Sequence, residues 1–293
     1  MVTGYFRQGI SNMARRPGLA GLLYGVNLVI GLLVTIPVYL ALDAATATTG
    51  FSSDLATQFD ITLWADVMED AFPTLRGLLN QLFWIIPLIL LWKTVASVGI
   101  ISTLHTRGVR SFGQGIGEHA GRAIVLALAF LVPVIALFVG LGISVFILTA
   151  IWSGEVGGFW VILVFLPLTL VGGLALLDLM HDYARMELVI GEKKVVESIL
   201  KGLSWPFRHF DSIGLYLAWF VVALLLLAIP TLIDIRPGGL WGVFVVQQFF
   251  LFTRAGVTIG WFGSEIDLYD SAQTADLPAI ARVEAEPHLT EVS

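Results

Sequence analysis

Two cations and one carboxylate lie inside apolar stretches of the sequence. Lys93 and Arg254 each fall within a run long enough for a membrane-spanning helix, and Asp178 falls near the end of another. Ionisable side chains in such helices are costly and often functional. The three residues therefore predict a site for an anion such as a lipid phosphate or a carboxylate. The alternatives are that the cations snorkel to the headgroups, or that Arg254 and Asp178 form a structural pair.

Histidines and carboxylates in polar segments could bind zinc or iron. Four histidines lie beside acidic residues, namely His105, His119, His181 and His209 with Glu118, Asp182 and Asp211. No two histidines are three or four residues apart, and no HExxH, GxSxG or Walker A motif is present. The absence of cysteine excludes disulfides and thiolate metal sites. We therefore predict no metal site, no cofactor and no catalytic residue, and we do not expect an enzyme.

The segment 60–72 has apolar and acidic residues at helical spacing, which is typical of a short helix on a membrane surface. Trp64, Met68 and Phe72 fall close to one face and are candidate contacts to a protein partner. The acidic residues Asp66, Glu69 and Asp70 are interpreted as a solvated face, with a cation site as the alternative. A second amphipathic helix is predicted over 182–209, on the opposite surface.

The composition identifies an integral membrane protein. Of 293 residues, 57% are hydrophobic and only 13% are charged, with a mean hydropathy of +0.88. Soluble domains carry about 25% charged residues, so this chain has too little charge to cover a water-facing surface. The 16 Lys and Arg against 22 Asp and Glu leave no basic face for a nucleic acid.

Six apolar stretches are long enough to cross a bilayer, which takes about 20 helical residues. They lie near 18–42, 78–103, 123–150, 158–180, 213–234 and 239–262. Most Lys and Arg residues fall at the N-terminus, in the second and fourth connections and in the tail, so both termini are predicted to be cytoplasmic. The first stretch exceeds the 7–15 apolar residues of a signal peptide and is interpreted as a permanent helix.

Three segments before the outward-running spans share a pattern. A glycine is followed by Ile or Leu, with an apolar residue three before it and a basic residue or His seven after it. The glycines are Gly9, Gly115 and Gly202. This predicts an all-α fold of three tandem parallel units, each an interfacial helix followed by a transmembrane hairpin. The predicted units are 5–104, 111–181 and 182–264 within a membrane domain of residues 1–270, followed by an acidic, disordered tail at 271–293.

Three motifs carry a resemblance to known proteins: FRQGISNMARRPGLAGLLYGVN, DYARMELVIGEKKVVESILKGLSWPFRHF and GWFGSEIDLYDSA. The sequence resembles uncharacterised bacterial polytopic membrane proteins akin to the membrane domain of glycerophosphoryl diester phosphodiesterases. The catalytic activity of that family resides in a separate soluble domain, which this sequence lacks, so no catalytic residue is carried over. The resemblance implies a bacterial cytoplasmic (inner) membrane location.

Two hypotheses for function follow. The first is a non-enzymatic subunit or scaffold that contacts membrane lipids and another membrane protein through its interfacial helices. The alternative is a lipid- or anion-handling carrier that uses the intramembrane cations Lys93 and Arg254 with Asp178 as their counter-ion.

Overall fold

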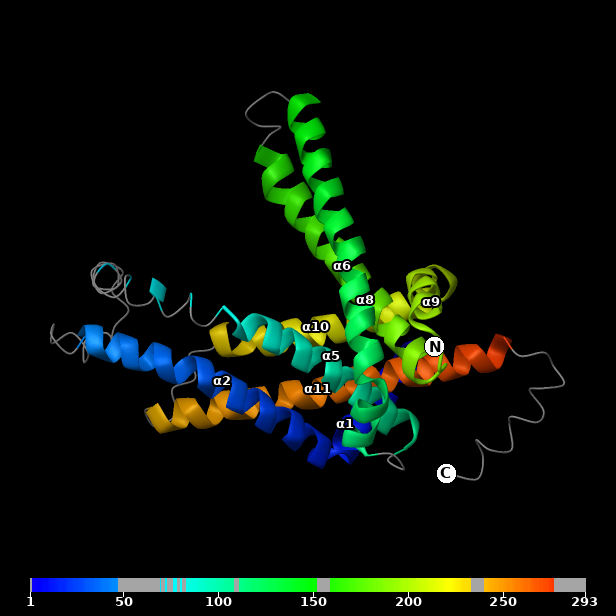
Figure 1. The fold of residues 1–293 in the computed structure, drawn as a ribbon, viewed down its shortest axis with the longest axis horizontal. Coiled ribbons are helices and arrows are strands. Elements are labelled where there is room, and N and C mark those ends of the chain that lie inside the picture. The colour runs from blue at the N-terminus through cyan, green and yellow to red at the C-terminus, as the bar shows by residue number, and fades with distance from the viewer. Residues whose placement is uncertain are drawn as a thin grey trace. The chain divides into compact units, whose positions relative to one another are not determined.

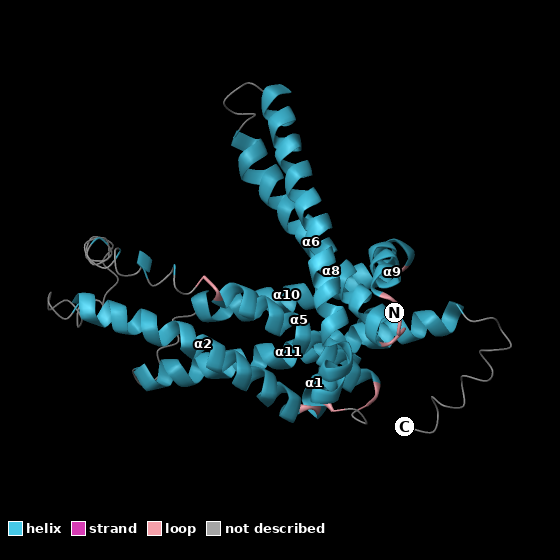
Figure 2. Cartoon of the chain, in the orientation of Figure 1, coloured by secondary structure: helices cyan, strands magenta, loops and turns pink. Residues whose placement is uncertain are grey.

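The computed structural model describes residues 2–46, 83–107, 111–151, 159–232 and 240–276, with single positions at 69, 72, 76, 77 and 80. This part of the chain is helical, and none of its residues lies in a β-strand (Figure 2), as predicted. The elements are α1 (Val2–Arg15), α2 (Pro17–Thr46), α5 (Ile85–His105), α6 (Phe112–Ile151), the π-helical turn η1 (Val161–Phe165), α8 (Leu166–Val189), α9 (Val195–Arg208), α10 (Phe210–Leu232) and α11 (Leu240–Asp276).

Six helical segments in the described ranges are long and apolar enough to cross a membrane. They are Pro17–Leu40, Ile85–His105, Phe112–Ile151, Val161–Val189, Phe210–Ile229 and Gly242–Ala275. Each corresponds to one of the six predicted spans, so the prediction of six helices long and apolar enough to cross a membrane is confirmed. Their outward side chains are largely Leu, Ile, Val and Phe, as expected where lipid replaces water.

The chain divides into two compact units, residues 1–20 with 94–293 and residues 21–93. In the smaller unit, Trp92 Nε1 donates a hydrogen bond of 3.2 Å to Asn27 Oδ1. In the larger unit, α6 and α8 form an antiparallel pair, and α1 packs along α11 (Figure 1).

Proline residues and local backbone geometry determine where the helices begin and end. Arg16 separates α1 from α2 because Pro17 disfavours helical geometry in the residue before it and suits the first helical position. His209 separates α9 from α10, with φ −128° and ψ 79°. No proline interrupts 112–123, and these residues form the first turns of α6. The separate interfacial helix predicted for the second unit is therefore wrong.

The predicted helix over 182–209 is also two elements. Residues 182–189 continue α8 and are mostly buried, and α9 begins only at Val195. The chain turns at Gly191 and Glu192, and Glu192 has a φ of 50°, in the left-handed region. A left-handed residue ends a helix because it cannot continue the right-handed hydrogen-bond ladder.

The core of the larger unit surrounds a buried tryptophan of α10. Trp219 of α10 is 1% exposed and packs with Leu215, Val257 and Leu268. Its Nε1 donates a hydrogen bond of 2.7 Å to Ser264 Oγ on α11, so the buried indole N–H is paired.

Candidate functional site

Asp178 and Arg254, both in the larger unit, form no ion pair with each other or with any other described residue. Both side chains are exposed, and Asp178 accepts a hydrogen bond of 2.9 Å from the Tyr216 hydroxyl. Lys93 is exposed and belongs to the smaller unit, 21–93. The structure therefore turns Asp178 toward α10 rather than toward Arg254.

Asp178 instead lines a cavity of about 470 Å³ between α6, α8 and α10. Most of its wall is apolar, formed by Phe130, Val134, Val171, Leu174, Ala175, Leu177 and Phe220. Asp178, His181 and Tyr216 supply its polar groups. A mostly apolar hollow with a few polar side chains is the usual form of a small-molecule site.

The polar wall is held by contacts among helices. The His181 ring stacks on Phe130, with ring centroids 4.5 Å apart, and its Nδ1 lies 2.7 Å from Arg185 Nη2. Arg185 also forms a 2.7 Å ion pair with Asp182, in which both side chains are largely buried. His181 Nε2 is buried and has no hydrogen-bond partner among the described residues. A buried polar atom without a partner is costly, so this nitrogen is an unsatisfied polar group beside the cavity.

Tyr216 connects the cavity to a buried carboxylate on α11. The Tyr216 ring packs edge-on against Trp261, with centroids 4.8 Å apart. Trp261 Nε1 in turn donates a hydrogen bond of 2.9 Å to Oε1 of Glu265, a residue with 0% exposure. Glu265 Oε2 lacks a partner in the described part of the chain.

Sequence reasoning missed this buried network. Residue types and spacing group Asp182 with the four histidines, and they single out neither Arg185 nor Glu265. One sequence signal could have identified these residues. It is the presence of charged side chains in the DYARMEL and SEIDLYD segments, where helices continue past the apolar spans. The burial of Glu265 depends on tertiary packing, which residue spacing does not reveal.

The four histidines lie in different surroundings. His105 pairs with Asp270 at 3.5 Å, and His119 lies 3.7 Å from Glu118. His209 packs on Trp205, with centroids 4.3 Å apart, whereas His181 lines the cavity. Within the described ranges, no three His, Asp or Glu side chains are grouped so that they could hold a metal ion.

The predicted partner-binding residues are only partly described. Phe72 is 59% exposed. Trp64 and Met68, the other residues of the predicted surface helix apart from Glu69, and the tail from 277 to 293 lie outside the described residues.

The fold defines an all-helical, multi-pass membrane protein, with a polar-ended apolar cavity as its candidate site. Comparisons with known protein families, with curated proteins and with solved structures gave no match.

Proposed function

We propose that this protein is a non-enzymatic membrane protein that binds a lipid in the cavity between α6, α8 and α10. The observation that carries the proposal is the cavity itself, with apolar walls and Asp178, His181 and Tyr216 as its polar groups. Its wall includes side chains that are open to their surroundings, since Val171 is 53% and Leu174 is 37% exposed. In a bilayer these positions face acyl chains, so a lipid tail reaches the cavity without crossing water.

This proposal keeps the lipid-handling hypothesis and changes its site. Lys93 and Arg254 are exposed on helices that would face lipid, which favours snorkelling toward headgroups for both cations. The polar wall of the cavity is then the place where a headgroup would bind, and the apolar wall is where its chain would lie.

The experiment is native mass spectrometry of the protein extracted gently from its own membrane, with the bound phospholipid counted. Ala175→Phe places a ring in the cavity wall, and Leu168→Phe is its matched control because Leu168 lies on the same helix, is 71% exposed and does not line the cavity. We expect lipid retention in the wild type and in Leu168→Phe, and its loss in Ala175→Phe. Equal retention in all three proteins would refute the proposal.

A second candidate is a scaffold or subunit role through α9. Ser198, Gly202 and Trp205 are buried on one face of this helix. Large apolar side chains elsewhere on it are exposed, with Val196 at 69% and Leu200 at 64%. An exposed apolar face with neighbouring lysines suits a membrane surface or a partner helix. Photocrosslinking from position 200 would give a protein adduct if a partner binds there, and lipid adducts alone would eliminate the scaffold role.

We also propose that the chain consists of three tandem units, in which each unit contacts the preceding one and the first contacts the third. The support comes from the repeat glycines, each of which lies so close to another helix that an added Cβ would come within 2.5 Å of it. Each contacts the second span of the preceding unit, and the first unit contacts the third: Gly115 meets α5, Gly202 meets α8 and Gly9 meets α11.

The basic residue seven positions after the glycine gives further support in two units. Arg16 Nη1 donates a hydrogen bond of 2.8 Å to Thr103 O, and Arg122 Nη2 donates one of 3.4 Å to Leu188 O. These carbonyls lie at or near the C-terminal ends of α5 and α8, the second spans of the same units. Cations stabilise helix C-termini, so a shared structural role accounts for this shared position.

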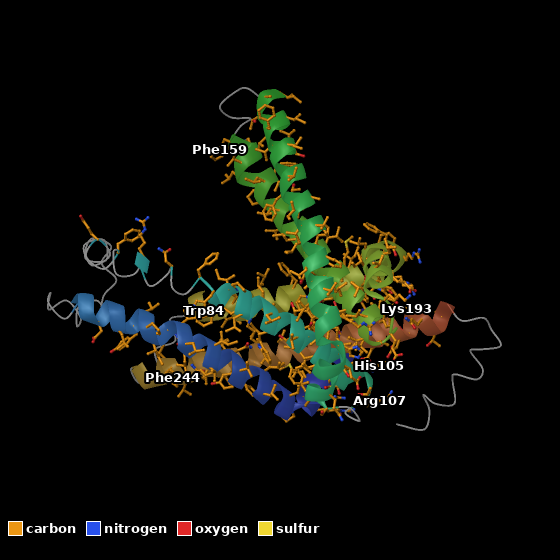
Figure 3. The ribbon with its side chains drawn as sticks, in the orientation of Figure 1. Trp84, His105, Arg107, Phe159, Lys193 and Phe244 are labelled. Carbon is orange, nitrogen blue, oxygen red and sulfur yellow. The ribbon has the colours of Figure 1, made fainter. Side chains whose placement is uncertain are left out.

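Both termini are proposed to lie in the cytoplasm of a bacterial cell, with the spans in its inner membrane. Figure 3 supports one polar side for the larger unit, since His105, Arg107 and Lys193 lie at helix ends remote from Phe159 and Phe244. The chain contains no cysteine, so single cysteines test the placement cleanly. Gly4→Cys and Gln273→Cys should react with an impermeant reagent only in opened cells, whereas Glu155→Cys should react in intact cells with an opened outer envelope. The reverse pattern would reject the orientation.

A further inference from the structure

We infer that the exposed face of α9 binds anionic phospholipids at the membrane surface. This face is an apolar stripe formed by Val196, Leu200 and Phe207, whose exposed fractions are 69%, 64% and 60%. The three residues are four and seven positions apart, so they lie along one side of the helix. The stripe is separate from the cavity between α6, α8 and α10, because none of its residues lines that cavity.

The opposite side of α9 packs against α8. An added Cβ on Gly202 would lie 2.5 Å from the Ala184 Cβ and 2.6 Å from the Met180 carbonyl oxygen. Trp205, also on this side, is 7% exposed and stacks on Tyr183, with ring centroids 4.8 Å apart. Figure 1 shows α9 beside the C-terminal part of α8. Because these contacts hold one side of the helix, the stripe is turned away from the rest of the protein.

The same contacts hold α9 at the level where two spans end. Met180 is followed closely by the charged residues Asp182 and Arg185, so it lies where the apolar part of α8 ends. At its other end, α9 is separated only by His209 from α10, whose apolar span begins at Phe210. Phe210 is itself 71% exposed. We therefore place α9 at the boundary between the apolar core of the membrane and its headgroups.

Cations at both ends of the stripe favour anionic headgroups. Lys194 and Arg208 are exposed, and neither forms an ion pair with a described residue. The other two lysines of this segment pair with Glu197, at Nζ–Oε1 distances of 3.5 and 3.9 Å. The segment 192–208 as a whole carries four cations and two carboxylates. Basic residues beside an apolar helix face are typical of helices that lie on anionic membranes.

An anionic phospholipid surface fits both parts of this face. Its acyl chains cover the three apolar side chains, and its phosphates lie within reach of Lys194 and Arg208. A zwitterionic lipid offers the same acyl chains, but its surface carries no net charge to attract the two cations. One side of α9 cannot hold both lipid and a partner helix, so lipid on the stripe excludes the scaffold role.

The test measures which lipid lies against the stripe. The chain contains no cysteine, so a fluorophore on Leu200→Cys reports on this position alone. The full-length protein is placed in nanodiscs of equal parts phosphatidylcholine and phosphatidylglycerol, and one of the two lipids carries a nitroxide quencher on its acyl chain. Phe244→Cys is the matched control position, because Phe244 is 46% exposed and lies at a helix end remote from Lys193 (Figure 3).

We expect phosphatidylglycerol to be enriched at least about fivefold over phosphatidylcholine at position 200, because one basic residue near an anionic surface contributes about that factor. At position 244 the two lipids should quench equally. Lys194→Gln with Arg208→Gln should bring the ratio at position 200 close to one, since the segment 192–208 then has no net charge. Arg76→Gln removes an exposed cation from the smaller unit and should leave the ratio unchanged.

Several results would overturn the inference. Equal quenching by the two lipids at position 200 removes the anionic preference, and the same preference at position 244 removes its assignment to α9. Quenching by neither lipid shows that the stripe does not face the membrane, and a protein adduct at position 200 would then assign it to a partner. High salt screens exposed charges, so a ratio that persists in high salt contradicts the electrostatic cause even if the glutamine variants fail to fold.

Discussion

Gly9 of α1 and Gly260 of α11 lie in direct backbone contact. A Cβ on Gly9 would lie 2.5 Å from the Gly260 carbonyl oxygen and 2.8 Å from the Trp219 ring. Two helices approach this closely only where neither has a side chain. The contact anchors the N-terminal helix to the last span, although the two glycines are far apart in the sequence.

Gly9→Ala should therefore destabilise the protein by about 1–3 kcal/mol, the usual effect of overpacking. Gly4→Ala is the matched control in the same helix, because an added Cβ there meets nothing within 4 Å. Alanine favours helix over glycine, so the control should gain about 0.5–1 kcal/mol. Unfolding in a detergent series measures both variants. A Gly9→Ala variant as stable as the control would show that α1 does not pack on α11 as described.

Gly115→Ala should also destabilise the protein, because the added Cβ would meet a different neighbour, Ser102 of α5. The added Cβ would lie 2.5 Å from Ser102 Cβ, and the next residue is at an ordinary 3.5 Å. Ser102→Gly removes the obstructing side chain, and the Ser102 hydroxyl is itself buried without a hydrogen bond in the described structure. The double variant should thus recover at least about 1 kcal/mol relative to the sum of the single variants. Additive losses would contradict the contact.

Glu192→Gly should stabilise the protein by about 0.5–1 kcal/mol. Glu192 has a φ of 50°, which costs a residue with a Cβ about 1–2 kcal/mol and costs glycine little. Glu192→Ala is the control, since it removes the same carboxylate and keeps the Cβ. The Gly variant should unfold later than the Ala variant in the same detergent series. If the two unfold together, the turn between α8 and α9 is not left-handed in solution.

The spans were predictable from sequence because apolar length alone decides whether a helix can cross a bilayer. The repeat glycines were also found from the sequence, yet the sequence gives no indication of which helix each one meets. Gly9 shows why: the pattern around it is local, whereas its contact with Gly260 joins segments that are far apart in the chain.

Of the three polar residues of the candidate site, Asp178 and His181 were named from the sequence and Tyr216 was not. Arg254 was the natural counter-ion because both residues are charged groups inside spans. In the structure, Asp178 accepts a hydrogen bond from the Tyr216 hydroxyl. Tyr216 lies within an apolar span, where the sequence does not distinguish it from its apolar neighbours. His181 was identified by type, but its role in the cavity wall depends on the approach of α6, which places Phe130 against its ring.

The ion pair between Arg185 and Asp182 should be a strong determinant of stability near the cavity. Its two side chains are 14% and 6% exposed, at a distance of 2.7 Å. Arg185→Met leaves a buried carboxylate without its cation and should cost about 3–5 kcal/mol. Lys193→Met is the matched control, because the pair of Lys193 with Glu197 is 39% and 47% exposed and such surface pairs contribute at most about 1 kcal/mol. Arg185→Met with Asp182→Asn removes both charges and should recover most of the loss. The detergent unfolding series compares the four proteins, and equal effects of Arg185→Met and Lys193→Met would show that the α8 pair is not buried from solvent.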